Sequence, residues 1–143
     1  MIMLNVALCS YGMSGKVFHA PLISAERGLY LHTVLQRNEP TALADYPQVN
    51  IVKDFEEIIV NPDIHLVVVN TPNELHYPMT KAALLAGKHV VVEKPFTLSM
   101  DEGNELIALA KRQQKILSVF QNKRLESDHL DTKNIIESCS RIN

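Results

Sequence analysis

A glycine-bearing turn near the start of the chain has residue types suited to holding a phosphate. The apolar run Leu4–Cys9 leads into Ser10-Tyr11-Gly12-Met13-Ser14-Gly15, and a helix-compatible segment follows. A helix start offers free backbone N–H groups, and glycine lets an anion approach the backbone closely. Gly12 and Gly15 match the last two glycines of the dinucleotide-binding pattern Gly-x-Gly-x-x-Gly, whereas Ser10 replaces the first. A plain strand-to-helix turn would explain two glycines equally well, so residues further along must decide.

The end of the second predicted strand bears on which dinucleotide would be bound. Residues 29–35 are rich in β-formers, and Gln36-Arg37-Asn38 follow them. In a dinucleotide-binding fold, an Asp or Glu at the end of this strand binds the ribose 2′-hydroxyl. In this sequence the first acidic residue after the strand is Glu39, a little beyond the expected position. Arg37 can instead pair with a 2′-phosphate, which favours NADP over NAD. A solvated arginine at a strand end is the alternative.

Polar residues also follow the later predicted strands. The buried-looking run 64–69 leads into Thr71-Pro72-Asn73, and His76 stands in the first turn of the next helix. Strand 89–92 ends in Glu93-Lys94-Pro95, and strand 116–120 ends in Gln121-Asn122. Glu93 and Lys94 could instead form a surface ion pair without a role in a site, which would be worth less than about 1 kcal/mol.

Strands and helices alternate along the chain. Six strands joined by helical crossovers predict an α/β fold with a doubly wound parallel sheet, in which ligands bind at the carboxyl ends of the strands. The remaining predicted strands are 4–9 and 50–53. The first predicted helix is 14–26, with a break at Pro21, and residues 40–49 are expected to be a loop. A short helix follows the capping residues Asp54 and Glu57, and another runs from an Asn73 cap to Ala86. The last two predicted helices are one that begins at Ser99 and Glu102 and one over 127–138.

Composition narrows the classes of function. With 143 residues and 46% hydrophobic content, the chain is long enough for one domain that buries about two-thirds of its unfolded surface. A net charge of −2 argues against a nucleic-acid partner, and no apolar run suits a membrane span. No signal peptide or metal-ligand spacing is evident, so we expect a cytoplasmic protein without a metal, with Cys9 and Cys139 as free thiols.

Several of these stretches resemble one family in order and spacing. The matching stretches are 11–22, Thr71-Pro72-Asn73 with His76, Glu93-Lys94-Pro95, and Gln121-Asn122 with Arg124. Together they resemble the amino-terminal NAD(P)-binding Rossmann domain of the Gfo/Idh/MocA oxidoreductases, and Glu-Lys-Pro is the most specific of them. We therefore expect a Rossmann domain over residues 1–122 and a helical extension over 123–143.

The resemblance implies roles for individual residues. Ser10 to Gly15 would cradle the pyrophosphate, with Ser10 loosening the turn, and Arg37 with Asn38 would lie beside the adenosine ribose. Lys94 would be the catalytic residue, because an ammonium polarises a carbonyl as hydride arrives. The other residues expected to contact the cofactor are Thr71, Pro72, Asn73, His76, Glu93, Gln121 and Asn122.

Relatives in this family continue into a second domain that binds substrate, which this sequence does not contain. One hypothesis is an NAD(P)-dependent oxidoreductase, represented by its cofactor domain, that moves hydride to or from a sugar, cyclitol or polyol. The other is a truncated or degenerate nucleotide-binding module without turnover of its own. A homodimer is a further expectation, if the domain exposes apolar surface that a second domain would cover.

Overall fold

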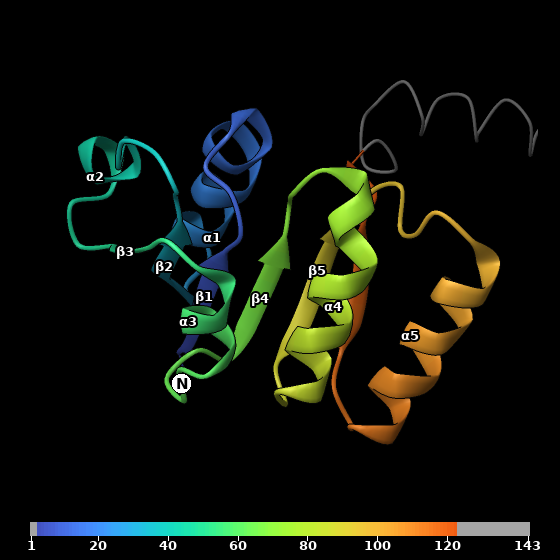
Figure 1. Ribbon diagram of the computed structural model, residues 1–143. Coiled ribbons are helices and arrows are strands. Elements are labelled where there is room, and N and C mark those ends of the chain that lie inside the picture. The colour runs from blue at the N-terminus through green and yellow to red at the C-terminus, as the bar shows by residue number, and fades with distance from the viewer. Residues whose placement is uncertain (1–2, 123–143) are drawn as a thin grey trace, which may run out of the picture.

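The computed structural model describes residues 3–122, and in them six strands form one sheet (Figure 1). Every pair of neighbouring strands is parallel, in the spatial order β3-β2-β1-β4-β5-β6. The predicted doubly wound parallel sheet is therefore confirmed. Its strands are β1 (Leu4–Leu8), β2 (Leu29–Leu35), β3 (Asn50–Val52), β4 (Leu66–Val69), β5 (His89–Glu93) and β6 (Leu117–Phe120).

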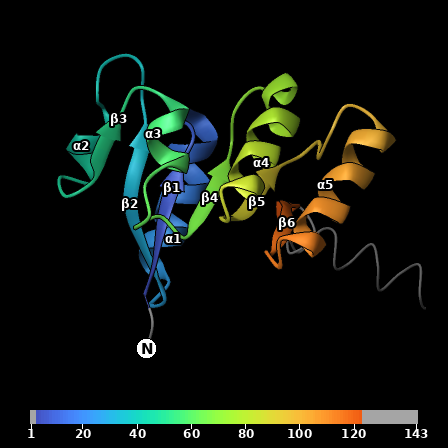
Figure 2. The same cartoon turned by 60° about the horizontal axis from the view of Figure 1, so that its bottom comes forward.

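Helices cover both faces of this sheet (Figures 1 and 2). Side chains of α3 (Phe55–Ile59), α4 (His76–Leu85) and α5 (Met100–Arg112) form one core, and those of α1 (Ala20–Ala25) and α2 (Ala42–Asp45) form the other. Successive residues of a strand point to opposite faces, so the central strand β1 supplies Ala7 to the first core and Leu8 to the second. Burial on both faces explains why the central strands are apolar throughout.

The first crossover helix changes type near Pro21 but does not break there, because residues 13–25 are helical without interruption. Residues Gly15–His19 form a π-helical turn, η1, and α1 begins directly after it at Ala20. The proline lies in the first turn of α1, directly after the π-helical turn, and it has no N–H to donate to that turn. His19, the last residue of η1, is buried, so this turn directs an imidazole into the protein interior.

The predicted helix ends at the other crossovers are also present. Asp54 is the N-cap of α3, and its N–H donates to Glu57 Oε1 at 3.1 Å. Ser99 Oγ accepts the N–H of Glu102 at 3.3 Å at the start of α5. Gly87 follows α4 with a φ of +74°, the left-handed conformation that commonly ends a helix.

Residues 40–49 contain the short helix α2, where the sequence predicted only a loop. Contacts from the glycine-bearing turn hold this helix. The Tyr11 hydroxyl donates to Asp45 Oδ2 at 2.8 Å, and Lys16 Nζ lies 3.0 Å from the same oxygen. Both contacts keep the pKa of Asp45 below its ordinary value, because they stabilise the carboxylate. Tyr11 therefore packs into the core and fastens α2 to the sheet.

The prediction that Asn73 caps the helix after β4 is wrong. A 3-10 turn, η2 (Asn73–Leu75), precedes α4, and no side chain caps either element. An N-cap needs an extended backbone, but Leu75, the residue before α4, is already helical with φ −93° and ψ −11°. Asn73 thus lies one turn too early to cap α4.

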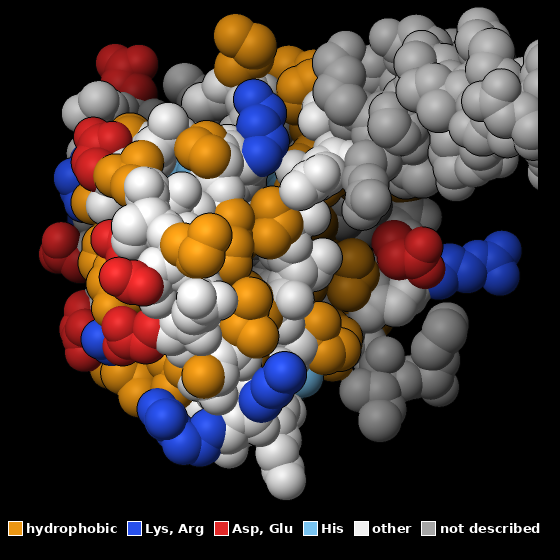
Figure 3. Space-filling view, turned by 90° about the vertical axis from the view of Figure 1, so that its right-hand side faces the viewer, with side chains coloured by type: hydrophobic (Ala, Val, Ile, Leu, Met, Phe, Trp, Pro, Cys, Tyr) orange, Lys and Arg blue, Asp and Glu red, His pale blue; other side chains and the backbone are white. Residues whose placement is uncertain are grey.

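The face at the right-hand side of Figure 1 carries hydrophobic side chains scattered among acidic and basic ones (Figure 3). In residues 3–122, no helix combines the length and the apolar character that crossing a membrane requires. Cys9 is a buried free thiol. The predicted helix 127–138, the extension 123–143 and Cys139 lie outside the described residues.

Close packing makes one glycine of the first turn indispensable. A Cβ added to Gly15 would lie 2.2 Å from the carbonyl oxygen of Ser10 and 2.9 Å from Asn70 Nδ2. A Cβ added to Gly12 would meet Ser10 Oγ at 3.5 Å, which is an ordinary contact. Gly15 is therefore required by the fold, and Gly12 is not.

We expect Gly15→Ala to lower the free energy of unfolding by about 1–3 kcal/mol, because a backbone carbonyl must shift to admit the methyl group. Gly28→Ala is the matched control, since nothing lies within 4 Å of a Cβ added there. Chemical denaturation of both variants measures the difference. Equal stability of the two would contradict the assigned role of Gly15.

Candidate functional site

Two adjoining hollows lie at the carboxyl edge of the sheet. The first has a volume of about 360 Å³ and lies between the first turn and the ends of β2 and β4. The second, of about 250 Å³, lies between η1 and the ends of β4 and β5. Thr71 lines both, so the hollows meet at the end of β4. Both hollows thus lie at the edge where the topology of the sheet places ligands.

Seven of the predicted cofactor residues line the first hollow. Its apolar side comes from Leu35, Leu75 and Met79, none of which was predicted. Cys9 adds a neutral thiol, because burial strongly raises its pKa. The predicted residues that line it are Ser10, Tyr11, Gly12, Arg37, Asn38, Thr71 and Pro72.

The exposed Arg37 stands on a loop that Gln36 organises. The Gln36 side-chain amide donates to the carbonyl oxygen of Glu39 at 3.2 Å and to Thr41 Oγ1 at 3.0 Å. From β3, Lys53 Nζ donates to the carbonyl oxygen of Arg37 at 3.3 Å. Two cationic residues therefore stand together beyond the ends of β2 and β3.

The second hollow brings together residues from four loops. The predicted residues that line it are Ser14, Thr71, His76, Glu93, Lys94 and Asn122, and Phe18 and Asn70 also line it. The sequence did not single out the last two as site residues. Lys94 is exposed there, and it is the cationic side chain of this lining.

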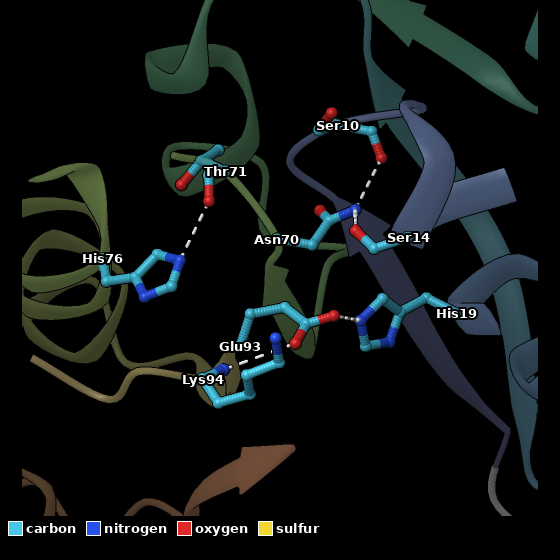
Figure 4. Close-up of polar contacts among 8 residues, drawn as sticks. All are labelled: Ser10, Ser14, His19, Asn70, Thr71, His76, Glu93 and Lys94. Atoms are coloured by element: carbon cyan, nitrogen blue, oxygen red, sulfur yellow. Dashed lines mark hydrogen bonds and ion pairs between the residues drawn. The ribbon is translucent and has the colours of Figure 1, made fainter. Parts of the chain in front are cut away.

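Asn70 is a tether that the sequence analysis missed. Its side-chain amide donates to the carbonyl oxygen of Ser10 at 2.8 Å and reaches Ser14 Oγ at 3.5 Å (Figure 4). The contact joins the end of β4 to the first turn. Asn70 Oδ1 and Thr71 Oγ1 are buried without a partner among the described residues.

Ser10 makes two hydrogen bonds within the first turn and to the end of β4. Its Oγ accepts the N–H of Gly12 at 3.2 Å, and its carbonyl oxygen is held by Asn70. These two bonds fix Ser10 within the turn, and the expectation that serine in place of glycine loosens the turn stays a prediction. A serine hydroxyl can bond to the backbone two residues on, which supplies the local fold that a glycine would supply through conformational freedom.

His76 joins two loops of the second hollow. Its imidazole Nδ1 lies 2.7 Å from the carbonyl oxygen of Pro95, and Nε2 lies 2.9 Å from that of Thr71. The side chain is 1% exposed, so both ring nitrogens face the protein. His76 thus positions the loops after β4 and β5, and it has little surface to offer a ligand.

Glu93 likewise bonds within the protein. Its Oε1 lies 2.8 Å from His19 Nε2, and its Oε2 accepts the N–H of Lys94 at 3.3 Å (Figure 4). The two side chains are 5% and 13% exposed for His19 and Glu93. The alternative interpretation, a surface ion pair of Glu93 with Lys94, is absent among the described contacts, and Glu93 bonds to His19 instead.

Four predicted residues stand apart from the hollows or face away. Met13 is 79% exposed, Asn73 is exposed, and neither lines a hollow. Gly15 is buried inside the turn. Gln121 lines a further hollow beside β6, which shares Asn122 with the second hollow. Within residues 3–122, no cluster of His, Cys, Asp or Glu side chains could hold a metal ion.

Known proteins share both the sequence and the fold. The chain is 44% identical to the oxidoreductase YdgJ of Escherichia coli over 133 residues, which cover 93% of this chain and 38% of YdgJ. It is 38% identical to the scyllo-inositol 2-dehydrogenase (NADP(+)) IolW of Bacillus subtilis, covering 96% of this chain and 38% of IolW. The crystal structure of an oxidoreductase from Klebsiella pneumoniae superposes with a TM-score of 0.89 at 48% identity, over 96% of this chain and 40% of that one.

The chain thus spans about two fifths of the length of these relatives. A family profile described as an oxidoreductase family with an NAD-binding Rossmann fold matches residues 4–121. The chain therefore belongs to the Gfo/Idh/MocA oxidoreductase family, and residues 4–121 form its NAD-binding Rossmann domain.

Proposed function

We propose that this chain is the cofactor domain of an NAD(P)-dependent oxidoreductase that acts on a secondary alcohol or its ketone in a sugar, cyclitol or polyol. The observation that carries the proposal is the pair of hollows joined at Thr71. An extended dinucleotide has two halves, and the two hollows offer a place for each of them. The substrate class is supported by IolW, whose name states that it oxidises scyllo-inositol.

The residues present fit such a cofactor. The apolar side of the first hollow suits an adenine ring, and Gly12 leaves its rim open for a phosphate. The orphaned oxygens of Asn70 and Thr71 lie near the junction, where a ribose hydroxyl could donate to them. When bound, the nicotinamide supplies or accepts the hydride.

Arg37 and Lys53 favour NADP as the cofactor. A 2′-phosphate carries up to two negative charges, and a guanidinium can bind it through two parallel hydrogen bonds. Lys53, 3.3 Å from the carbonyl oxygen of Arg37, adds a second positive charge near the same place. The name of IolW, which specifies NADP(+), agrees with this preference.

Lys94 is the residue that we propose to act on the substrate. Its exposed ammonium group belongs to the lining of the second hollow, where it can stabilise the negative charge that develops on a carbonyl oxygen. It can also pass a proton to that oxygen. Glu93 acts indirectly, because both of its oxygens bond to the protein.

A nucleotide-binding module without turnover is the second candidate. The observation that favours it is that the family profile matched by residues 4–121 is described by its NAD-binding Rossmann fold. Both candidates require cofactor binding, so binding is the first property to test. Turnover of a polyol by the 143-residue chain would then separate them.

We expect Arg37→Ala to weaken NADPH binding about tenfold or more, and NADH binding much less, because only NADPH has the 2′-phosphate. Calorimetric titration of the 143-residue chain with each cofactor measures both affinities. Arg27→Ala is the matched control, since Arg27 is an exposed arginine before β2, at the opposite edge of the sheet. An equal loss for both cofactors would contradict the role of Arg37.

We expect Gly12→Ala to weaken NADPH about tenfold or more while leaving the free energy of unfolding nearly unchanged. A Cβ at Gly12 fits against the protein, at 3.5 Å from Ser10 Oγ, but occupies the path of the phosphates. Titration and chemical denaturation of the same sample give the two quantities. Unaltered NADPH affinity would place the pyrophosphate elsewhere.

A further inference from the structure

A buried imidazole lies directly behind the residue proposed to act on substrate. His19 comes from η1, and Glu93 and Lys94 come from the end of β5, 74 and 75 residues further along the chain. His19 Nε2 lies 2.8 Å from Glu93 Oε1, and the ring nitrogen is the donor when Glu93 is a carboxylate, because a carboxylate can only accept.

The imidazole is held on a second side. The ring of Phe120, at the end of β6, lies 4.5 Å from the His19 ring, centroid to centroid, with the planes tilted by 53°. His19 is 4% exposed, so it has almost no surface for a ligand. A contact with substrate or cofactor therefore does not explain why the protein places a histidine here.

Glu93 connects this imidazole to Lys94. One carboxylate oxygen accepts from His19 and the other accepts the backbone N–H of Lys94 at 3.3 Å. Figure 4 shows the three side chains in this order, with Glu93 in the middle. A free glutamate would rotate about its side-chain bonds, whereas a glutamate bonded at both oxygens cannot do so without breaking a hydrogen bond.

We propose that His19 is a positioning residue, which acts through the Glu93 carboxylate to fix the backbone of Lys94 at the wall of the second hollow. The proposal rests on the proposed function of that hollow. His19 touches neither cofactor nor substrate. Its effect is to hold Lys94 in the place from which the ammonium group can reach the nicotinamide half of the cofactor and the substrate carbonyl.

Two similar variants separate this role from general packing. In His19→Gln the amide nitrogen is as many bonds from Cβ as Nε2 of histidine, so it can still donate to Glu93. In His19→Asn the amide nitrogen takes the place of Nδ1 and falls short. Both variants are neutral amides, and both give up the ring contact with Phe120. They therefore differ chiefly in the bond to Glu93.

The first readout is hydrogen exchange of the Lys94 amide, followed by NMR without any ligand. We expect exchange to be about five- to tenfold faster in His19→Asn than in the unaltered chain, and to be restored in His19→Gln. The exchange rate of the Val68 amide, in the central strand β4, reports general loosening. Equal Lys94 exchange in the two variants, or a parallel change at Val68, would overturn the proposal.

The second readout is the affinity for two ligands, NADPH and 2′,5′-ADP. We expect His19→Asn to weaken the affinity for NADPH about fivefold and to leave the affinity for 2′,5′-ADP within twofold of that of the unaltered chain. We expect His19→Gln to restore the affinity for NADPH. Equal losses for both ligands would show that His19 only supports the fold. If the unaltered chain binds neither ligand, the proposed function fails, while the exchange of Lys94 still decides the role of His19.

Discussion

All six strands run parallel, and this single constraint assembles the site. Parallel strands bring all their carboxyl ends to the same edge, whatever the distance between them in the sequence. The order β3-β2-β1-β4-β5-β6 adds a second condition, because the chain moves outward from β1 in one direction and from β4 in the other. The strand order therefore reverses direction between β1 and β4, and the two hollows lie on either side of this switch point.

Buried polar side chains then hold the loops of this edge together. Asn70 fastens the first turn to β4, and His76 fastens the loop after β4 to the loop after β5. The pair of His19 and Glu93 fastens η1 to β5. A buried polar group without a partner is costly, so each of these contacts restricts the loops strongly. The proposed ligands would therefore bind to loops whose positions are already fixed by these contacts.

The sequence predicts the strands well because they carry a strong local signal. A strand that is covered on both faces needs an apolar residue at every position, and runs such as Val67 to Val69 show this pattern. Capping residues such as Ser99 predict the helix starts for the same reason, since a cap acts within a few residues. The sequence indicates Lys94 and Arg37 as candidates because they come within two residues of a strand end, where position along the chain also gives position in space.

The residues that support the site could not be found in this way. Asn70 bonds to a residue 60 positions away, and His19 bonds to Glu93 across 74 positions. No local pattern indicates which buried imidazole meets which carboxylate. Tyr11 illustrates the same limit, because its partner, Asp45, lies in a helix that the sequence did not predict. The sequence predicts which residues reach the edge, and the tertiary contacts decide which of them remain free to bind.

We propose that one dinucleotide occupies both hollows at once. The most direct test is NMR titration of the 143-residue chain with NADPH, following the backbone amides of Gly12, Thr71 and Lys94. We predict that all three shift with the same midpoint, because one ligand spans the first hollow, the junction and the second hollow. Shifts confined to Gly12 with none at Lys94, or different midpoints at the two, would contradict a single extended site.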